Sequence, residues 1–195
     1  CSAASRAYIP SNLAAEVKKK LVDTIKTMKM GTVEDFTNFI NAVIDEKSFD
    51  KIAGYINFIK EQDDAEIIIG GNYDKSEGYF IEPTVIVTTD PKFKSMEEEI
   101  FGPVVTITPF ENEEDVLKMA NSTQYGLSAT LWTNDLKRAH RMAEEIQAGI
   151  VWINAWLVRD LRTPFGGVKS SGVGREGGFE ALDFFTEPKN VCVKL

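Results

Sequence analysis

The chain has 195 residues, of which 43% are hydrophobic and 27% are charged, so it can bury the core of one large domain, or of one domain with an appendage. Its formal net charge of -8 argues against nucleic acid as a partner, because such binding relies on clustered Lys and Arg side chains. The longest nearly apolar run, Ala148 to Val158, is too short to span a bilayer, and no signal peptide is expected. Cys1 and Cys192 provide neither a disulfide framework nor metal-ligand spacing, so we expect an intracellular protein without a metal site.

Helices and strands are predicted to alternate as far as residue 153. Ser11 is expected to cap the first long helix, which should stop at Gly31. Asp45 is expected to open the second, whose buried side should hold Phe49, Ile52, Ala53, Ile56 and Ile59. In chain order we predict a strand at 3–9, a helix at 11–31, a helix from 45, a strand at 67–69, extended chain at 79–89 broken at Pro83, a strand at 104–110, a helix at 113–120, a strand at 129–133, a helix from 134 or 135 to 149, and a strand at 150–153. The buried face of the last helix is expected to hold Leu136, Ala139, Ala143 and Ile146.

This alternation indicates the fold class. Strands separated by helices of ten or more residues form parallel β-α-β units, so we expect an α/β fold, a layered α-β-α domain with a mostly parallel sheet. Ligands of such sheets gather where strand ends meet loops, and Asn154 follows the last predicted strand.

The segment from Asn154 to Gly178 contains six glycines and has neither helical nor strand periodicity. It also carries Trp156, Leu157 and Phe165, whereas flexible linkers are poor in such residues. A loop that presents aromatic rings, arginines and free backbone N–H groups suits a small polar or anionic ligand. A long structural connection is the alternative.

The last residues differ from the rest of the chain. A short helix is predicted around 176–184, and KNVCVKL, at Lys189 to Leu195, alternates like a strand. Such a terminal strand must pair at a sheet edge or cross to another subunit. We therefore divide the chain into a domain at 1–185 and a C-terminal strand segment at 186–195.

Few residues suggest a catalytic centre by themselves. The single histidine, His140, lies beside the apolar stripe of its helix, which argues against a triad or a histidine metal site. Glu97, Glu98 and Glu99 run into the apolar turn IFGP, where the last carboxylate could belong to a site. No GxGxxG follows a strand, so no dinucleotide-binding fingerprint is present. Cys1 is the remaining candidate nucleophile.

Six stretches occur in a fixed order: CSAASRAYIP, GYFIEPTVI, EEEIFGPVVTI, NSTQYGLSATLWT, GIVWINAW and PFGGVKSSGVGREGG. In this order and spacing they resemble the C-terminal, catalytic half of the aldehyde dehydrogenase superfamily. The resemblance spans essentially the whole chain. It implies the catalytic-domain fold of that family, an aldehyde substrate, NAD as cofactor with NADP as the alternative, and a homo-oligomer assembled through Asn190 to Leu195. It also implies a cytoplasmic or mitochondrial location.

The resemblance assigns roles to the residues that match its motifs. Cys1 takes the place of the nucleophile that forms a thiohemiacetal with the aldehyde. Glu99 takes the place of the glutamate that binds the nicotinamide ribose, with Phe101 beside it. The substrate-binding residues implied are Ser2, Asn154, Trp156, Arg162 and Phe165.

Some family features are missing from this stretch. The cofactor-binding domain, the general-base glutamate and the oxyanion-hole asparagine precede the cysteine in the family, so we expect this chain to be a fragment whose partner is an N-terminal cofactor-binding domain. Alone, it is expected to be inactive. A non-catalytic oligomerising module and a thiol esterase that needs only Cys1 stay open as alternatives.

The substrate class is indicated by two subfamilies. Up to about Pro109, text such as FINAVIDEKSFDKI resembles the pyrroline-5-carboxylate (glutamate semialdehyde) dehydrogenases of proline catabolism. From about Phe110, NAWLVRDLRTPFGG resembles the 2-aminomuconate and 2-hydroxymuconate semialdehyde dehydrogenases, so a chimera is conceivable. Both act on aldehydes that carry a carboxylate. We take the glutamate semialdehyde type as the main interpretation and expect Arg162 to bind the carboxylate, with Arg159 and a salt bridge to Asp160 as competing interpretations.

Overall fold

The computed structural model describes residues 2–195 and divides them into two compact units. The first unit comprises residues 3–119, and the second comprises Ser2 together with residues 120–195. The predicted division into 1–185 and 186–195 stays a prediction.

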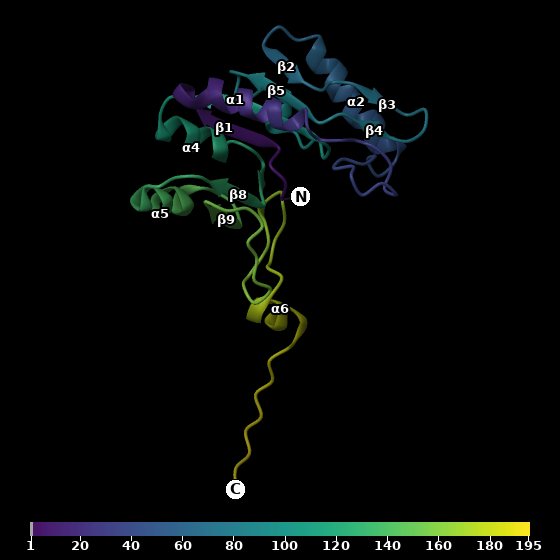
Figure 1. Ribbon diagram of the computed structural model, residues 1–195. Helices are drawn as coiled ribbons and strands as arrows, with labels where there is room; N and C mark the ends of the chain where they lie inside the picture. The colour runs from purple at the N-terminus through teal and green to yellow at the C-terminus, as the bar shows by residue number, and fades with distance from the viewer. Residues whose placement is uncertain (1) are drawn as a thin grey trace. The chain divides into compact units, whose positions relative to one another are not determined.

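The first unit is built on a four-stranded sheet (Figure 1). Its order is β1 (Arg6–Pro10), β6 (Val104–Phe110), β5 (Thr84–Thr88) and β2 (Ala65–Ile69). β1 and β5 both pair with β6 in parallel, and β2 pairs with β5 in antiparallel. The expectation of a mostly parallel sheet is therefore confirmed, with one antiparallel strand at its edge.

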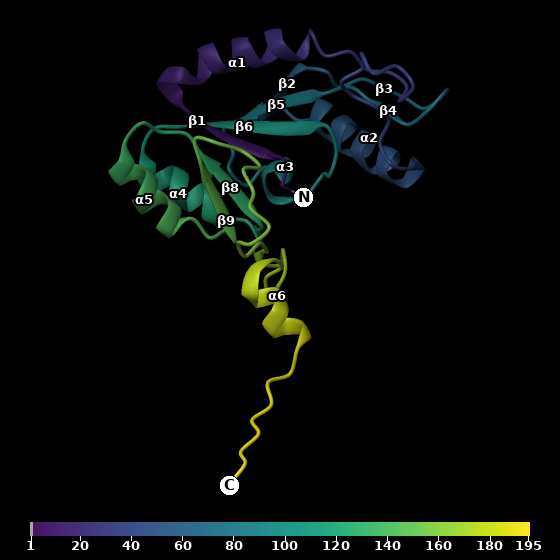
Figure 2. The ribbon, with the colours of Figure 1, turned by 60° about the horizontal axis from the view of Figure 1, so that its bottom comes forward.

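Helices cover both faces of this sheet (Figure 2). α1 (Ser11–Ile25) lies over one face, and α2 (Glu46–Lys60) and α3 (Lys94–Glu97) lie over the other. The alternation along β5 explains the two sides: Ile86 belongs to the core cluster under α2, whereas its neighbour Val85 is buried on the opposite face. The layered α-β-α arrangement expected from the sequence is thus present in this unit.

α2 was predicted closely because its sequence carries a complete start signal. The Asp45 carboxylate accepts a hydrogen bond from the Ser48 backbone N–H at 2.7 Å and caps the helix. Its buried residues are the predicted ones, Phe49, Ile52, Ala53, Ile56 and Ile59. They form the main part of the core cluster of this unit.

The prediction for α1 was wrong at both ends. Ser11 is the first helical residue rather than the cap, and its Oγ donates to the Phe110 carbonyl oxygen at 3.1 Å. The helix ends at Ile25, well before Gly31. The Thr24 and Thr27 hydroxyls donate to the carbonyls of Lys20 and Thr24 there, and such local bonds compete with helix propagation.

Three further elements complete this unit. β3 (Tyr73–Asp74) and β4 (Phe80–Ile81) come between β2 and β5 in the sequence and form a separate small antiparallel pair. α4 (Glu113–Asn121) follows β6 and runs across the boundary between the units. Sequence periodicity did not predict β3 or the single turn of α3.

The second unit contains two pairs of short strands. β8 (Ser128–Leu131) and β9 (Ile150–Ile153) are parallel and are connected by α5 (Leu136–Glu145), as predicted. β7 (Tyr125–Gly126) pairs in antiparallel with β10 (Val168–Lys169), which lies inside the segment predicted to have no regular structure. The Asp135 carboxylate caps α5. Leu136 was expected to face inward but is 70% exposed, and the buried residues of α5 are Ala139 and Met142.

Two glycines bring the long loop close to the start of β9. A Cβ at Gly149 would lie 1.6 Å from the Gly166 carbonyl oxygen, so only a residue without a side chain fits there. Val168 of β10 pairs with Gly126 of β7. The loop that leaves β9 therefore returns and packs against Gly149, the residue before β9, and against β7.

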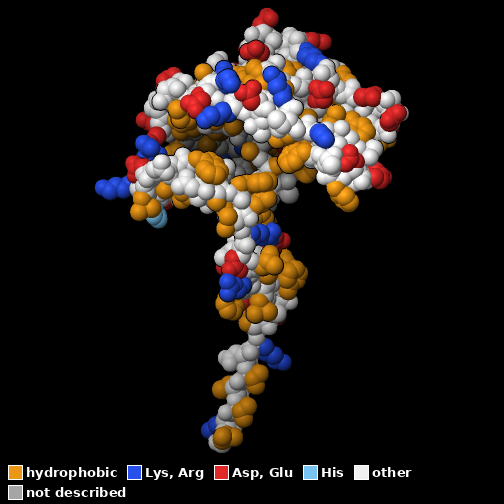
Figure 3. Space-filling model, viewed as in Figure 1, with side chains coloured by type: hydrophobic (Ala, Val, Ile, Leu, Met, Phe, Trp, Pro, Cys, Tyr) orange, Lys and Arg blue, Asp and Glu red, His pale blue; other side chains and the backbone are white. Residues whose placement is uncertain are grey.

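The C-terminal residues of this unit contain α6 (Gly178–Phe185) and then no regular structure. The strand predicted at Lys189 to Leu195 is not formed, because a strand needs another strand to pair with, and within residues 2–195 no strand pairs with residues 189–195. Apolar side chains are exposed along α6 and this segment (Figure 3). They include Phe179, Leu182, Phe184, Phe185, Val191, Val193 and Leu195. Across residues 2–195, every helix is too short or too polar to cross a bilayer.

Candidate active site

The predicted nucleophile, Cys1, lies outside the described residues. Glu99 and Phe101 belong to the first unit. The substrate-binding candidates Ser2, Asn154, Trp156, Arg162 and Phe165 belong to the second.

In the first unit, Glu99 lies in a tight turn between α3 and β6. Ile100 is 5% exposed and anchors the turn in the core, whereas the Phe101 side chain is 61% exposed. Phe101 has a φ of 61°, a left-handed conformation that is unfavourable for a bulky residue. At the next position, a Cβ on Gly102 would lie 2.5 Å from Ile52 Cδ1, so the backbone passes directly over α2.

The Glu99 carboxylate is exposed and has no hydrogen-bond partner among residues 2–195, while the groups around it are engaged. Lys51 Nζ donates to the Glu99 carbonyl oxygen at 2.7 Å. The Tyr55 hydroxyl donates to the carboxylate of the neighbouring Glu98. Within residues 2–195 the Glu97 carboxylate also lacks a hydrogen-bond partner, but Glu97 ends α3, whereas Glu99 presents its carboxylate from the constrained turn, as a ligand-binding residue would.

In the second unit, Asn154 ends β9 with its amide turned back toward β8. Its Oδ1 accepts from the Thr133 backbone N–H at 2.8 Å, and its Nδ2 donates to the Thr133 carbonyl oxygen at 2.7 Å. Its φ of 53° is left-handed, a conformation that Asn tolerates better than most residues. The structure therefore shows Asn154 directing the start of the loop, and one N–H and one lone pair of its amide are left for a ligand.

Ser2 and Trp156 are brought together despite their separation in sequence. Trp156 Nε1 donates to the Ser2 carbonyl oxygen at 3.0 Å, and the Trp156 side chain is 52% exposed. Trp152 of β9, four residues before Trp156, donates to the Val158 carbonyl oxygen at 2.9 Å. The two indoles fix the first part of the loop and hold it close to residue 2.

The Arg159 guanidinium packs against the Phe165 ring. Its Cζ is 4.3 Å from the Phe165 ring centroid, within the range of a cation–π contact. The guanidinium also forms an ion pair with Glu176, whose backbone exchanges two 2.8 Å hydrogen bonds with that of Phe165. A cation that is partly covered by an aromatic ring and oriented by a carboxylate is a suitable partner for an anionic group.

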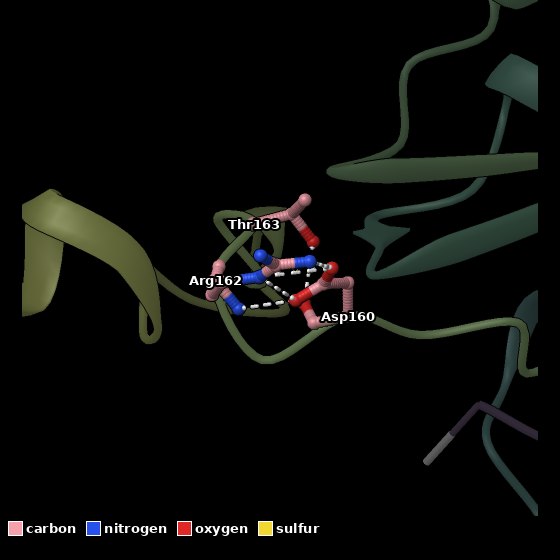
Figure 4. A network of polar contacts seen from close by, with 3 residues as sticks. All are labelled: Asp160, Arg162 and Thr163. Atoms are coloured by element: carbon pink, nitrogen blue, oxygen red, sulfur yellow. Dashed lines mark hydrogen bonds and ion pairs between the residues drawn. The ribbon is translucent and has the colours of Figure 1, made fainter.

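Arg162 is arranged differently (Figure 4). Its Nε is 2.9 Å from Asp160 Oδ1, its Nη2 pairs with Asp160 Oδ2, and its side chain is 89% exposed. These hydrogen bonds from Arg162 hold the pKa of Asp160 below its ordinary value. The Thr163 hydroxyl donates to the Asp160 carbonyl oxygen at 2.7 Å and closes the turn. Arg162 therefore already has a carboxylate partner in its own loop.

No group of three or more His, Cys, Asp or Glu side chains within residues 2–195 is arranged to hold a metal ion. His140 is exposed on α5. The first unit thus offers Glu99 on a strained turn, and the second unit separately offers an arginine–aromatic cluster in its long loop.

Sequence reasoning missed the residues that support the candidates. Thr133, Glu176, Lys51 and Tyr55 received no role, because their contacts join positions that are distant in sequence. Glu176 belongs to the quoted GREGG motif, so a signal was present there. For Lys51 and Tyr55 the only hint was that they lie four residues apart and flank the apolar stripe of a predicted helix.

Comparison with known proteins now defines the class of protein. The model of the aldehyde dehydrogenase family matches residues 1–191. This chain belongs to the aldehyde dehydrogenase family, as the motifs indicated.

Individual relatives refine this assignment. A 2-aminomuconic semialdehyde dehydrogenase from Danio rerio is 42% identical over 201 residues, which cover 100% of this chain and 41% of the relative. A 2-hydroxymuconic semialdehyde dehydrogenase from Pseudomonas putida is 38% identical over 200 residues, with 100% and 41% covered. A crystal structure of betaine aldehyde dehydrogenase from Staphylococcus aureus in complex with NAD+ has a TM-score of 0.89 and 35% identity over 95% of this chain and 37% of that chain. The chain thus spans about two fifths of the length of these relatives.

Proposed function

We propose that this chain supplies the cysteine-bearing part of an NAD-dependent dehydrogenase that oxidises a carboxylate-bearing semialdehyde of the muconate type. The observation that carries the proposal is the Arg159–Phe165–Glu176 cluster. It combines a cation, an aromatic wall and an orienting carboxylate in the loop whose sequence resembles that of the muconate enzymes. In the proposal, Cys1 is the nucleophile that attacks the aldehyde carbon.

The described residues suit one end of the cofactor. NAD, when bound, accepts the hydride that leaves the substrate carbon. The exposed, unpartnered Glu99 carboxylate on its constrained turn can accept hydrogen bonds from the two hydroxyls of the nicotinamide ribose, and the exposed Phe101 ring can pack beside it. The chain lacks a glycine-rich dinucleotide fingerprint, so the pyrophosphate and adenine would be bound by another part of the protein.

The relatives bear on the choice between the two interpretations of the substrate. Relatives that match the whole chain are named 2-aminomuconic or 2-hydroxymuconic semialdehyde dehydrogenases. They support the muconate alternative better than the glutamate semialdehyde interpretation, and they do not support a role in proline catabolism. We therefore propose a muconate-type semialdehyde as the substrate.

Arg159 is the better candidate for the substrate carboxylate. Its side chain is 37% exposed and touches the pocket-lining Phe165, whereas the Arg162 side chain is 89% exposed and is paired within its own turn. Both arginines have a carboxylate partner, but Asp160 occupies Nε and Nη2 of Arg162, whereas Glu176 contacts Arg159 through Nη2 alone and leaves it more donors for a substrate. Binding of the carboxylate by Arg162 stays a prediction, and we propose Arg159 as the residue that binds it.

The test uses a full-length protein that carries this chain. Aldehyde-dependent NADH formation is measured with a muconate-type semialdehyde, with glutamate semialdehyde and with propanal, in the wild type and in Cys1→Ser. The proposal expects the highest kcat/KM for the muconate-type compound and loss of turnover in Cys1→Ser. A preference for propanal, or turnover that survives the serine substitution, would contradict it.

A further inference from the structure

The turn that carries Glu99 is held by three residues on one side of α2. Lys51 donates to the Glu99 carbonyl oxygen at 2.7 Å, and the Tyr55 hydroxyl donates to the Glu98 carboxylate. Between them, Ile52 lies so close to Gly102 that no Cβ fits there. Lys51 and Tyr55 occupy positions i and i+4, on one face of the helix, and Ile52 borders that face on its buried side. A single helix surface therefore contacts the turn at its beginning, its middle and its end.

The turn requires such support. Phe101 has a φ of 61°, and a bulky residue persists in the left-handed region only where its surroundings fix the backbone. Ile100, which is 5% exposed, fixes one side of Phe101, and Gly102 over Ile52 fixes the other. Before Ile100, the hydrogen bond from Lys51 is the contact that orients the peptide group between Glu99 and Ile100.

The three contacts leave one group free. The Glu98 carboxylate is bound by Tyr55, and the Glu99 carbonyl oxygen is bound by Lys51, but the Glu99 carboxylate has no partner among residues 2–195. Lys51 is itself placed by Tyr55, because its Nζ lies 5.9 Å from the centroid of the Tyr55 ring. Since a side chain leaves the backbone in a direction set by its own peptide groups, the bond from Lys51 controls where the Glu99 carboxylate points.

We propose that Lys51 is a positioning residue for the cofactor: by binding the Glu99 carbonyl oxygen, it orients the Glu99 carboxylate toward the nicotinamide ribose. This inference rests on the proposed function, in which Glu99 binds that ribose. It predicts that Lys51 acts on cofactor affinity through Glu99 rather than on the chemistry of the aldehyde. Its effect should therefore vanish when Glu99 can no longer bind the ribose well.

The experiment is a double-mutant cycle in a full-length protein that carries this chain. Lys51→Met keeps the length and the apolar stem of the side chain but removes the donor, and Lys51→Arg restores a donor. Lys47→Met is the matched control, because Lys47 is exposed on α2 one turn earlier and has no partner among residues 2–195. Glu99→Gln, alone and combined with Lys51→Met, completes the set. The readouts are the Kd for NAD by calorimetry, KM and kcat, and the thermal midpoint.

Lys51→Met is expected to weaken NAD binding about five- to thirty-fold, the range for loss of one charged hydrogen bond. The KM for the aldehyde should change less than about twofold by the same reasoning, because that site does not involve the turn. Lys51→Arg should recover most of the affinity, and Lys47→Met should match the wild type. Adding Lys51→Met to Glu99→Gln should cause little further loss, since both act through one carboxylate.

Each alternative outcome has a clear meaning. If Glu99→Gln leaves the Kd for NAD unchanged, the ribose-binding role in the proposed function fails, and this inference fails with it. If Glu99→Gln weakens binding but Lys51→Met only lowers the thermal midpoint, Lys51 is a structural residue and the inference alone is overturned. Additive losses in the double variant would also overturn it, because Lys51 would then act independently of Glu99.

Discussion

Asn154 and Thr133 exchange two hydrogen bonds, in which the side-chain amide of the first residue pairs with both backbone groups of the second. The amide imitates a strand residue and extends the pairing of β8 with β9 by one position beyond their ends. Because the Asn154 backbone is left-handed at this point, the chain turns away sharply into the long loop. The direction in which the loop departs is thus determined by a single side chain.

The first prediction tests this arrangement. Asn154→Ala should lower the free energy of unfolding by about 1 to 3 kcal/mol, because it removes two hydrogen bonds and places a Cβ residue in the left-handed region. Asn154→Gly removes the same hydrogen bonds but tolerates that backbone conformation, so it should cost roughly 1 kcal/mol less than Asn154→Ala. Urea denaturation of the three proteins gives both numbers. Equal losses would show that the backbone conformation is not strained.

The second prediction concerns Gly149. Gly149→Ala should destabilise the protein by about 3 kcal/mol or more, because the added Cβ would overlap the Gly166 carbonyl oxygen and backbone cannot move aside cheaply. Gly54→Ala is the control, since Gly54 lies within α2 and a Cβ there meets no atom within 4 Å. That change should stabilise the protein by about 0.5 to 1 kcal/mol through helix propensity. The midpoints of thermal unfolding of both variants test this prediction. A midpoint for Gly149→Ala at or above that of Gly54→Ala would contradict it.

The third prediction separates the two arginines of the loop. In a full-length protein, Arg159→Ala should reduce kcat/KM for an acidic semialdehyde about thirty-fold to a thousand-fold, the effect of losing a charged hydrogen bond at the substrate. Propanal turnover should fall only a few-fold, since propanal has no carboxylate. Arg162→Ala is the matched comparison and should have the smaller effect on the acidic substrate, because Asp160 already occupies both Nε and Nη2 of Arg162, whereas Glu176 contacts only Nη2 of Arg159. Selective loss in Arg162→Ala instead would return the anchor to Arg162.

The fourth prediction follows from the ionisation of Asp160. The hydrogen bonds from Arg162 lower the pKa of this carboxyl in the folded protein, so the pair stabilises the fold above the unfolded pKa of about 4. That contribution is lost as the pH falls through the lower folded pKa. Titration of the Asp160 carboxyl resonance by NMR should show the depressed pKa, and Arg162→Gln should raise it toward its ordinary value. An unchanged pKa in Arg162→Gln would mean that Arg162 does not bind Asp160 in solution.

The fifth prediction concerns the isolated 195-residue chain. Its contacts to NAD would be confined to the nicotinamide end at Glu99 and Phe101, so its Kd for NAD should be weaker than about 1 mM. Calorimetry on the chain alone measures this directly. A micromolar Kd would show that residues 2–195 contain a site for the rest of the cofactor that the structure did not reveal.

The sequence predicted those elements whose signals are local. The start and the buried residues of α2 were predicted, because Asp45 supplies the cap and five apolar residues recur at helical spacing. β6 was predicted with its correct limits, since VVTITPF is β-branched and bounded by Pro103 and Glu111. The end of α1 was not predictable in this way, because it depends on hydroxyl groups that bind nearby carbonyls instead of on a glycine.

The candidate site was predicted only in part for the same reason. Motifs identified Glu99, Asn154 and Phe165, but the residues that fix them lie between 11 and 48 positions away, and periodicity carries no information at that range. The terminal segment shows the opposite case. Its alternating pattern favours a strand locally, yet the predicted strand is not formed, because a strand forms only where another strand offers a free edge.

The near-contact between Gly149 and Gly166 bears on how substrate preference can be exchanged among relatives. A loop grafted from another member of the family would bring its own return path, which must thread past position 149 and pair with Gly126. Residues 154–178 are therefore not a self-contained cassette. A transplanted loop that keeps the acceptor's strand ends but replaces Gly149 or Gly166 would misfold before its specificity could be measured. The loop and the strand ends should therefore be transferred together.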